Sequence, residues 1–214
     1  MINPSITITN IIILVTCGVS IIAFYSHEVM YKWIFSPYEA RYHKQFYRFI
    51  TSGLLHANWI HLFFNMFVLY QFGNNVERYY RDMFDMKGIY YYILLYVGAL
   101  IVSNFPSYFK HHNDPGYQSL GASGAVSAVL FTFIIIDPFA RIAFFLPILE
   151  FPAIVWGVLY LAYEYWASKK QFDNIGHDAH FMGAIYGIVF SIAVKPSLVT
   201  SLIAELASRF HNFF

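Results

Sequence analysis

The sequence carries little charge for its length. Only 12% of its 214 residues are Asp, Glu, Lys or Arg, whereas 58% are hydrophobic, and the mean hydropathy is +0.51. A soluble domain usually has about twice that charged fraction, so the composition excludes an ordinary soluble protein. The net charge of +1 provides no basic field for nucleic acid, and nucleic-acid binding is excluded with it.

Cysteine is almost absent as well. Cys17 stands alone, so no internal disulfide can form. The first apolar run has no basic residues ahead of it and no small-residue cleavage pattern, which argues against a cleavable signal peptide. We therefore expect this run to remain in the protein as a membrane span.

The apolar residues come in blocks of membrane length. A spanning helix needs about 20 mainly apolar residues. Four blocks contain no Asp, Glu, Lys or Arg: Met1–His27, Phe49–Val76, Gly88–Phe109 and Pro115–Ile136. Two shorter runs, Phe151–Trp166 with Glu164 near one end and Ala179–Val194, add two further spans. The predicted spans are about 7–26, 54–75, 88–106, 121–137, 149–166 and 176–195.

The predicted fold is therefore an all-α polytopic membrane protein with six transmembrane helices. The stretch His27–Arg48 mixes aromatic and charged residues, which is typical of the membrane interface, and we expect an interfacial loop there, between the first two spans. Residues 1–196 form one membrane domain, and residues 197–214 form a short C-terminal amphipathic tail. Basic residues divide almost equally between the two sides, so they do not orient the protein.

Four polar side chains lie at membrane depth, where polar groups are costly and usually functional. His61 and Asn65 lie in the second span, Ser123 begins the fourth, and His180 begins the sixth. Alternate spans run in the same direction, so residues early in these three helices lie at similar depth below one surface. We expect a serine, a histidine and an amide–imidazole pair to converge there.

The spacing of small residues supports this convergence. Gly183 and Gly187 follow His180 on one helical stripe, and Gly124 follows Ser123; small residues let membrane helices approach closely. A serine needs a base such as His180 to become nucleophilic, and His61 with Asn65 can donate to an oxyanion. No Asp or Glu is expected at the depth of His180, so the predicted machinery is a Ser–His dyad.

Each of these residues also has a simpler interpretation. Asn65 can be an interhelical hydrogen-bonding residue, and the glycines can serve packing alone. A single intramembrane histidine can be a packing residue or part of a proton path. His177 and Asp178 lie near a loop, and we expect them to be structural. Only the combination, in the right helices and at matched depth, favours acyl-transfer chemistry.

The order of these motifs resembles the rhomboid family of intramembrane serine proteases. The likeness runs from about Gln45 to Val194 and rests on four motifs in sequence: Tyr47-Arg48; His56, His61 and Asn65; Gly121-x-Ser123-Gly124; and His180-x2-Gly183-x3-Gly187. Two positions depart from the family pattern. Tyr47 stands where Trp is usual, and Ser127 stands where a Tyr often stacks beneath the base, so another aromatic such as Phe181 or Tyr186 would have to support His180.

The resemblance implies a nucleophile at Ser123, a base at His180, and an oxyanion site made by His61, Asn65 and the Ser123 backbone N–H. Supporting positions would be Gly121, Gly124, Gly183, Gly187, Arg48 and His56. Neither a cofactor nor a metal is implied.

The resemblance also implies the partners, which are transmembrane protein substrates and the lipid bilayer. The substrates would be cut near small residues at a site that opens to the extracytoplasmic side. The second and fifth spans would form a lateral gate, with facing residues such as Phe67, Trp156 and Tyr160. The compact six-span chain suggests a bacterial inner membrane.

Three other functions compete with proteolysis. A catalytically inactive relative that binds membrane clients usually loses the serine, the histidine or the glycine motif, and all are present here. A small-solute transporter often shows internal repeats and broken helices, and the sequence shows neither. A metalloprotease is disfavoured because the His-Glu-x-x-His motif is absent: His27-Glu28 is followed by Tyr31.

Overall fold

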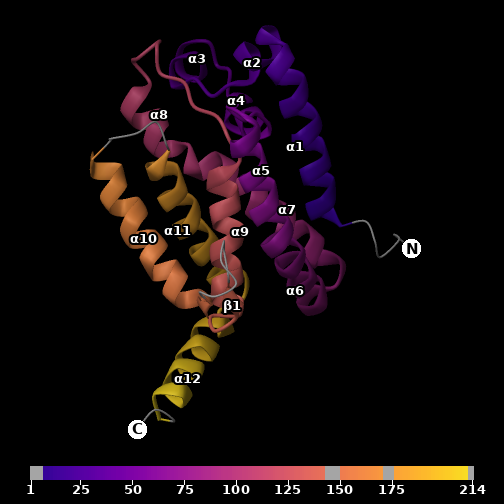
Figure 1. Cartoon of the computed structure of the whole chain (residues 1–214), viewed down its shortest axis with the longest axis vertical. Coiled ribbons are helices and arrows are strands. Elements are labelled where there is room, and N and C mark those ends of the chain that lie inside the picture. Colours follow the sequence, from indigo (N-terminus) through magenta and orange to yellow (C-terminus); the bar gives the residue numbers. More distant parts are fainter. Residues whose placement is uncertain (1–6, 143–149, 171–175, 212–214) are drawn as a thin grey trace.

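The computed structural model describes residues 7–142, 150–170 and 176–211, and most of them are helical (Figure 1). Three helical stretches are long and apolar enough to cross a membrane: Ile8–Tyr25, Met86–His111 and His177–Val194. A shorter apolar helix, Ser123–Ile136, runs through the middle of the molecule. The structure thus supports a mostly helical, polytopic membrane fold, while the predicted number of six spans stays a prediction, since three helices of the described residues meet the length and hydrophobicity of a span.

Four of the predicted spans coincide closely with helices. These are α1 (Ile8–Tyr25), α7 (Met86–Ser103), α9 (Ser123–Ile136) and α11 (His177–Val194). Helix α10 (Ala153–Lys170) begins later than the predicted fifth span and continues past it, while residue 149 lies outside the described residues. Helix α8 (Phe105–His111) extends α7 after Asn104.

The predicted bounds of the second span are wrong at both ends. Residues 55–58 are not helical, and α5 begins at Trp59, where the Asn58 side chain accepts a hydrogen bond from the His61 backbone and caps the helix. The helix then continues through a π turn, η2 (Leu69–Gly73), into α6 (Asn74–Phe84). It ends at Asp85, whose φ of +50° breaks the helical path.

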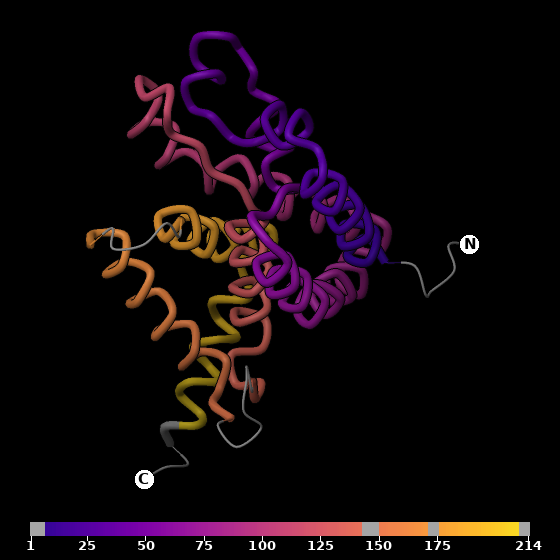
Figure 2. Tube along the Cα trace, turned by 45° about the horizontal axis from the view of Figure 1, so that its top comes forward, coloured from indigo at the N-terminus to yellow at the C-terminus, as the bar shows by residue number. Residues whose placement is uncertain are grey.

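The connection between α1 and α5 folds into short helices at one end of the molecule. These are α2 (His27–Trp33), α3 (Pro37–Tyr42), α4 (Arg48–Thr51) and the 3-10 turn η1 (Ser52–Leu54). Phe35 pairs with Ser119 through two backbone hydrogen bonds of 3.0 Å. The connection therefore lies beside the segment that leads into α9, at the same end as α8 (Figure 2).

Arg48 holds this connection together. Its side chain is buried and donates to the backbone oxygens of Tyr31 and Ile34 at 2.8 and 2.7 Å. Its guanidinium also lies over the Tyr47 ring, 5.7 Å from the centroid. The Tyr at position 47 thus still provides an aromatic face for this arginine.

The opposite end of the molecule carries the remaining elements. A two-stranded hairpin, β1 (Arg141–Ile142) and β2 (Phe151–Pro152), links α9 to α10. Helix α12 (Ser197–His211) follows α11 and projects away from the other helices (Figure 1). The predicted tail is therefore helical over its described part, and residues 212–214 lie outside the described residues.

Helix α9 lies at the centre of the core and packs against α7 and α11. A Cβ on Gly183 would come within 3.0 Å of the Gly124 Cα, and a Cβ on Gly187 within 2.8 Å of the Ala128 Cα. The backbones of α9 and α11 are therefore in direct contact, which only glycine at 183 and 187 permits.

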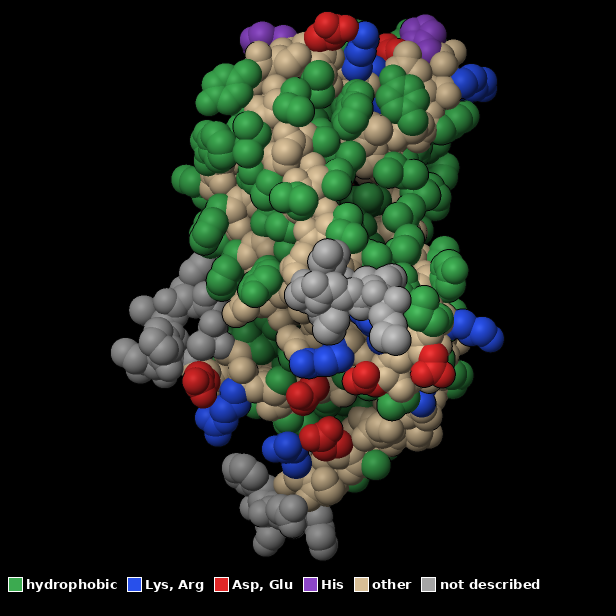
Figure 3. Space-filling model, turned by 90° about the vertical axis from the view of Figure 1, so that its right-hand side faces the viewer, with side chains coloured by type: hydrophobic (Ala, Val, Ile, Leu, Met, Phe, Trp, Pro, Cys, Tyr) green, Lys and Arg blue, Asp and Glu red, His purple; other side chains and the backbone are tan. Residues whose placement is uncertain are grey.

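An apolar belt surrounds the helices. Seen from the side of α1, hydrophobic side chains cover the middle of the molecule, and the charged and histidine side chains gather at its two ends (Figure 3). Leu14, Ile22 and Ile60 are among the large apolar side chains exposed, at 74%, 58% and 70%. Exposing such a belt to water would be unfavourable, whereas lipid tails would cover it.

A buried carboxylate fixes α1 to α6. Glu77 is 1% exposed and accepts hydrogen bonds from the backbone N–H groups of Ile8 and Thr9 at 3.0 and 2.9 Å. These N–H groups belong to the first turn of α1, where a helix has no internal acceptors for them. A negative charge at a helix N-terminus is also favoured by the helix dipole.

We predict that Glu77→Gln destabilises the folded protein. The carboxylate accepts the two backbone hydrogen bonds on two separate oxygens, whereas an amide has one acceptor oxygen and no negative charge. Leaving one buried donor unsatisfied costs about 1–3 kcal/mol. Thermal unfolding in detergent should therefore show a lower midpoint. The matched control is Glu28→Gln, whose carboxylate is exposed and pairs only with Lys32, and which should leave the midpoint unchanged. An equal midpoint for wild type and Glu77→Gln would contradict this role.

Candidate active site

Ser123 and His180 lie in direct hydrogen-bonding contact. Ser123 is the first residue of α9, and His180 lies in the first turn of α11. The Ser123 hydroxyl oxygen lies 2.8 Å from His180 Nε2, within hydrogen-bonding distance. The close backbone contact between Gly124 and Gly183 brings the two side chains together. Gly124 directly follows the serine, and Gly183 lies about one turn after the histidine.

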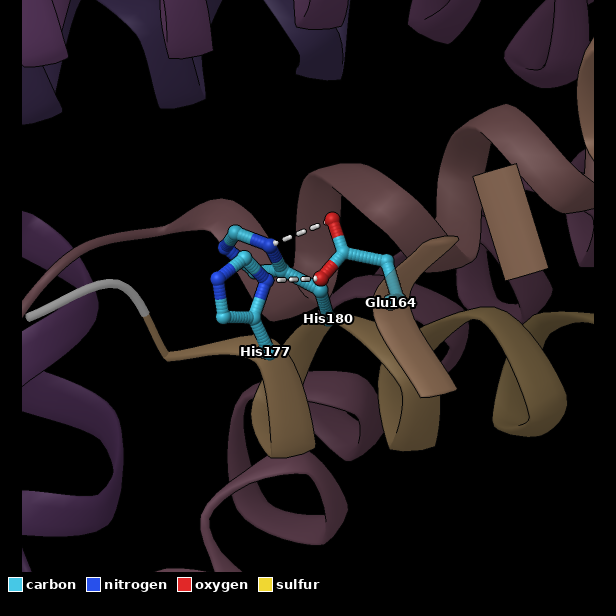
Figure 4. A group of neighbouring side chains, drawn as sticks. All are labelled: Glu164, His177 and His180. Atoms are coloured by element: carbon cyan, nitrogen blue, oxygen red, sulfur yellow. Dashed lines mark hydrogen bonds and ion pairs between the residues drawn. The ribbon is translucent and has the colours of Figure 1, made fainter. Parts of the chain in front are cut away.

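The other nitrogen of His180 contacts a carboxylate. His180 Nδ1 lies 3.1 Å from Glu164 Oε1, and His177 Nδ1 lies 2.6 Å from Glu164 Oε2. In Figure 4 both imidazoles point toward the Glu164 carboxylate, which comes from α10. The expectation that no Asp or Glu lies at the depth of His180 is therefore wrong.

The antiparallel arrangement of α10 and α11 explains this error. Residues late in α10 lie at the same level as residues early in α11, because the two helices are consecutive and side by side (Figure 1). The sequence held one signal for it: Glu164 interrupts an apolar run, and a charged residue at membrane depth is functional by default. His177, expected to be structural only, joins the same hydrogen-bonded group.

Neither aromatic proposed to support His180 lies beside it. The Tyr186 hydroxyl donates to the Leu94 backbone oxygen, and the Phe181 ring contacts Tyr165. Among the ring contacts of the described part of the chain, the neighbour of His180 is His177, at 6.2 Å. Ser127, the departure from the family pattern, bonds instead to the Tyr160 hydroxyl of α10 at 2.7 Å.

His61 lies over Gly121, the first residue of the serine motif. A Cβ on Gly121 would come 2.8 Å from His61 Cε1 and 3.8 Å from Ser123 Oγ, so the imidazole edge and the hydroxyl flank the same position. The Ala57 backbone N–H donates to His61 Nδ1 at 3.4 Å. In the neutral ring the proton is then on Nε2, the nitrogen nearer Gly121.

Two further donors belong to this region. Asn65 is 7% exposed, and its amide donates to the His61 backbone oxygen at 2.9 Å. This bond uses one of the two amide hydrogens. The Ser123 backbone N–H lies in the first turn of α9, whose N–H groups have no acceptor within the helix.

His56 supports this side of the site from below the surface. It is fully buried, and its Nδ1 lies 3.0 Å from the Ser20 hydroxyl of α1. Its ring meets the His61 ring edge-on, with 4.9 Å between the centroids. The non-helical segment ahead of α5 is thereby fixed both to α1 and to His61.

The predicted gate residues do not line a single cavity. Trp156 and Tyr160 line an apolar cavity of about 260 Å³ between α9 and α10. Phe67 lines a different one of about 240 Å³, with Gln71 and Phe133 among its neighbours. Ile142 of the hairpin lines both cavities, and the Trp156 indole donates to its backbone oxygen at 3.1 Å.

This arrangement provides the parts of an acyl-transfer site. A hydroxyl faces an imidazole, the imidazole faces a carboxylate, and N–H donors flank the hydroxyl. The ligand atoms of Glu164, His177 and His180 also lie within 4.8 Å of one another, a group that could hold a metal ion. The same three side chains form the hydrogen bonds between Glu164 and the two histidines.

The Rhomboid domain family matches residues 43–197, which are most of the chain and include Ser123, Glu164 and His180. The chain belongs to the rhomboid family. It is accordingly an integral membrane protein, as the apolar belt and the spanning helices indicate. The resemblance drawn from the sequence motifs is confirmed.

Relatives of this rhomboid occur in organelles and in bacteria. RHOMBOID-like protein 12, mitochondrial, of Arabidopsis thaliana is 31% identical over 63% of this chain and 42% of its own length. Presenilin-associated rhomboid-like protein, mitochondrial, of Mus musculus is 30% identical over 65% of this chain and 36% of its own length. The rhomboid protein YdcA of Bacillus subtilis (strain 168) is 35% identical over 38% of this chain and 37% of its own length. The matches thus cover about two fifths of each relative.

We predict that Gly121→Ala disables the site without unfolding the helices. Gly121 has a φ of +123°, which L side chains rarely adopt, and the new methyl group would push against His61. Labelling of Ser123 by a fluorophosphonate should become at least tenfold slower, as expected when catalytic groups shift by about 1 Å.

The matched control is Gly18→Ala, because a Cβ at Gly18 in α1 would meet nothing within 4 Å. This variant should label at the wild-type rate. Equal labelling of Gly121→Ala and wild type would show that the approach of His61 to the serine is not required.

Proposed function

We propose that this rhomboid is an intramembrane serine endopeptidase in which Ser123 is the nucleophile and His180 the base. The observation that carries the proposal is the 2.8 Å contact between the Ser123 hydroxyl and His180 Nε2, across helices whose residues are 57 positions apart. A hydroxyl bonded to an imidazole nitrogen is the arrangement in which a base can accept the serine proton.

In the proposed reaction, Ser123 Oγ attacks the carbonyl carbon of the scissile peptide bond while His180 Nε2 takes its proton. The negative charge that forms on the carbonyl oxygen is stabilised by the Ser123 backbone N–H, His61 Nε2–H and the second Asn65 amide hydrogen. His180 then gives the proton to the departing amine. Water repeats the sequence on the acyl-enzyme and releases the second product.

We place this site within a six-span bundle of α1, α5 to α6, α7, α9, α10 and α11. Its substrates would be transmembrane segments of other proteins that carry small residues at the cut, with helix-weakening residues nearby. Backbone groups in a helix are already hydrogen-bonded, and unpaired ones are expensive in lipid, so a substrate must unwind easily. The site would open to the extracytoplasmic side. The bacterial inner membrane stays a prediction, because the relatives include mitochondrial and bacterial proteins.

The Ser123–His180 contact favours proteolysis over client binding without cleavage and over solute transport. A rhomboid relative that only binds membrane clients needs neither a hydroxyl bonded to a base nor the proposed oxyanion donors beside it. A transporter would need a polar path through the bundle, whereas the cavity between α9 and α10 is lined by apolar and aromatic side chains, among them Leu130, Ile134 and Trp156.

The first prediction of the proposed mechanism is that Ser123→Ala abolishes cleavage of a reconstituted transmembrane substrate and abolishes fluorophosphonate labelling. The protein should remain folded, because only one hydroxyl is lost. His180→Ala should cause a similar loss, and the double variant should be no worse than either single variant, because nucleophile and base act as a unit.

Wild-type cleavage rates in Ser123→Ala would overturn the mechanism. Additive losses in the double variant would contradict the pairing of the two residues. The melting midpoint of each variant in detergent provides the control for folding.

A second prediction concerns lateral access of the substrate. Trp156 ties the hairpin end of α10 to Ile142 and contacts Phe151 edge-on, so Trp156→Ala should loosen α10. Cleavage of an embedded transmembrane substrate should become severalfold faster if helix displacement limits turnover. Hydrolysis of a short soluble ester should not change, and equal effects on both substrates would rule out a lateral gate at α10.

A further inference from the structure

A continuous chain of hydrogen bonds runs from the nucleophile into the protein interior. It begins at the Ser123 hydroxyl and passes through both nitrogens of His180 to Glu164 Oε1. It continues from Glu164 Oε2 to His177 Nδ1 (Figure 4). The chain joins three helices, since Ser123 lies on α9, Glu164 on α10 and both histidines on α11.

We propose that Glu164 is a positioning residue for the His180 base and that His177 in turn fixes Glu164, so that a dyad becomes a buried four-residue relay. This inference rests on the proposed protease function, and it deepens that function. Glu164 and His177 would act only through His180 and would not contact the substrate.

The carboxylate selects the productive form of the imidazole. An ionised carboxylate only accepts hydrogen bonds, so each histidine must present a protonated Nδ1 to it. With its proton on Nδ1, neutral His180 has its lone pair on Nε2, the nitrogen that faces the Ser123 hydroxyl. Without an acceptor at Nδ1, the ring can instead carry its proton on Nε2, where it cannot accept the serine proton.

The side chains that form these contacts are largely shielded from solvent. The side chains of His177 and Glu164 are 4% and 5% exposed, and that of His180 is 15% exposed. An ionised carboxylate in such a place is stable only when both oxygens are satisfied. His180 satisfies one oxygen and His177 the other, so His177 holds the carboxylate in the orientation that His180 requires.

The relay also stabilises the charged intermediate. When His180 accepts the serine proton it becomes an imidazolium, and the nearby negative charge of Glu164 lowers the free energy of that state. In soluble serine proteases, replacing the corresponding carboxylate by an amide lowers kcat about 10⁴-fold. The loss on replacing Glu164 should therefore fall on kcat and on labelling of Ser123, with little change in KM.

The test uses the full chain in detergent and measures fluorophosphonate labelling, kcat and KM on a transmembrane substrate, and the melting midpoint. Glu164→Gln should slow labelling and lower kcat roughly 10²- to 10⁴-fold. His177→Phe should lower both roughly tenfold, in line with the 10- to 100-fold cost of losing the residue behind a functional group. The double variant should equal Glu164→Gln alone, because His177 acts only through Glu164.

Glu77→Gln is the matched control, since it also removes a buried carboxylate, one that accepts hydrogen bonds from Ile8 and Thr9 and contacts none of the site residues. It should lower the melting midpoint and leave labelling unchanged. Should Glu164→Gln fail to fold, Glu164→Asp keeps the charge but withdraws it by one methylene group. It should fold and label at an intermediate rate.

Several outcomes would overturn the relay. Labelling within threefold of wild type in Glu164→Gln, or in both Glu164→Asp and His177→Phe, would reject Glu164 as a positioning residue while leaving Ser123 as the nucleophile. Multiplicative losses in the double variant would separate His177 from Glu164. Loss of wild-type labelling in EDTA, restored by Zn²⁺, would assign the three side chains to a metal instead. A wild type that neither labels nor cleaves would reject the protease function itself.

Discussion

The direct contact between the backbones of α9 and α11 determines the geometry of the site. Any side chain at Gly183 or Gly187 would occupy the place of the α9 backbone, and the two helices would have to separate. Such a separation would break the hydrogen bond between Ser123 and His180, and a displacement of about 1 Å at reacting groups can cost 10²-fold in rate. The glycine stripe and the polar pair are thus parts of one arrangement.

Polar groups elsewhere in the bundle also join helices to one another. Lipid offers no hydrogen-bonding partners, so a buried donor or acceptor is costly unless it finds a partner within the protein. Thr132 of α9 and Ser191 of α11 share a hydrogen bond of 2.9 Å further along the helix pair. Glu77 provides the acceptors for the start of α1. Each of these contacts joins two helices, and together they fix the helices against which the site is built.

Much of this structure was predictable from the sequence. Apolar runs predicted four of the spans closely, three from charge-free blocks and one from a shorter run, because length and hydrophobicity are enough to define a membrane helix. The alternation of spans predicted that Ser123 and His180 start their helices at one surface, and the structure brings them together. The glycines predicted which faces meet, since small residues mark close helix contacts.

Other features depended on information that the sequence pattern does not contain. Glu164 lies beside His180 because it is near the end of α10, which runs antiparallel to α11. The residues predicted to converge all begin helices that run in the same direction, so a residue near the end of a neighbouring helix was not among them. Helix α5 begins at Trp59 because the Asn58 side chain caps it, and hydropathy does not report such a cap. The continuation through a π turn to Phe84 takes the helix into a charged segment that composition assigns to a loop.

The order of the site residues along the chain affects how the protein is made. Synthesis delivers His61 and Ser123 to the membrane first, and Glu164 and His180 only afterwards. A nascent chain therefore holds its hydroxyl and oxyanion donors for some time without a base. In the proposed mechanism the nucleophile acquires its base only when α11 docks on α9, so the proposed protease would be completed by the last of the six proposed spans.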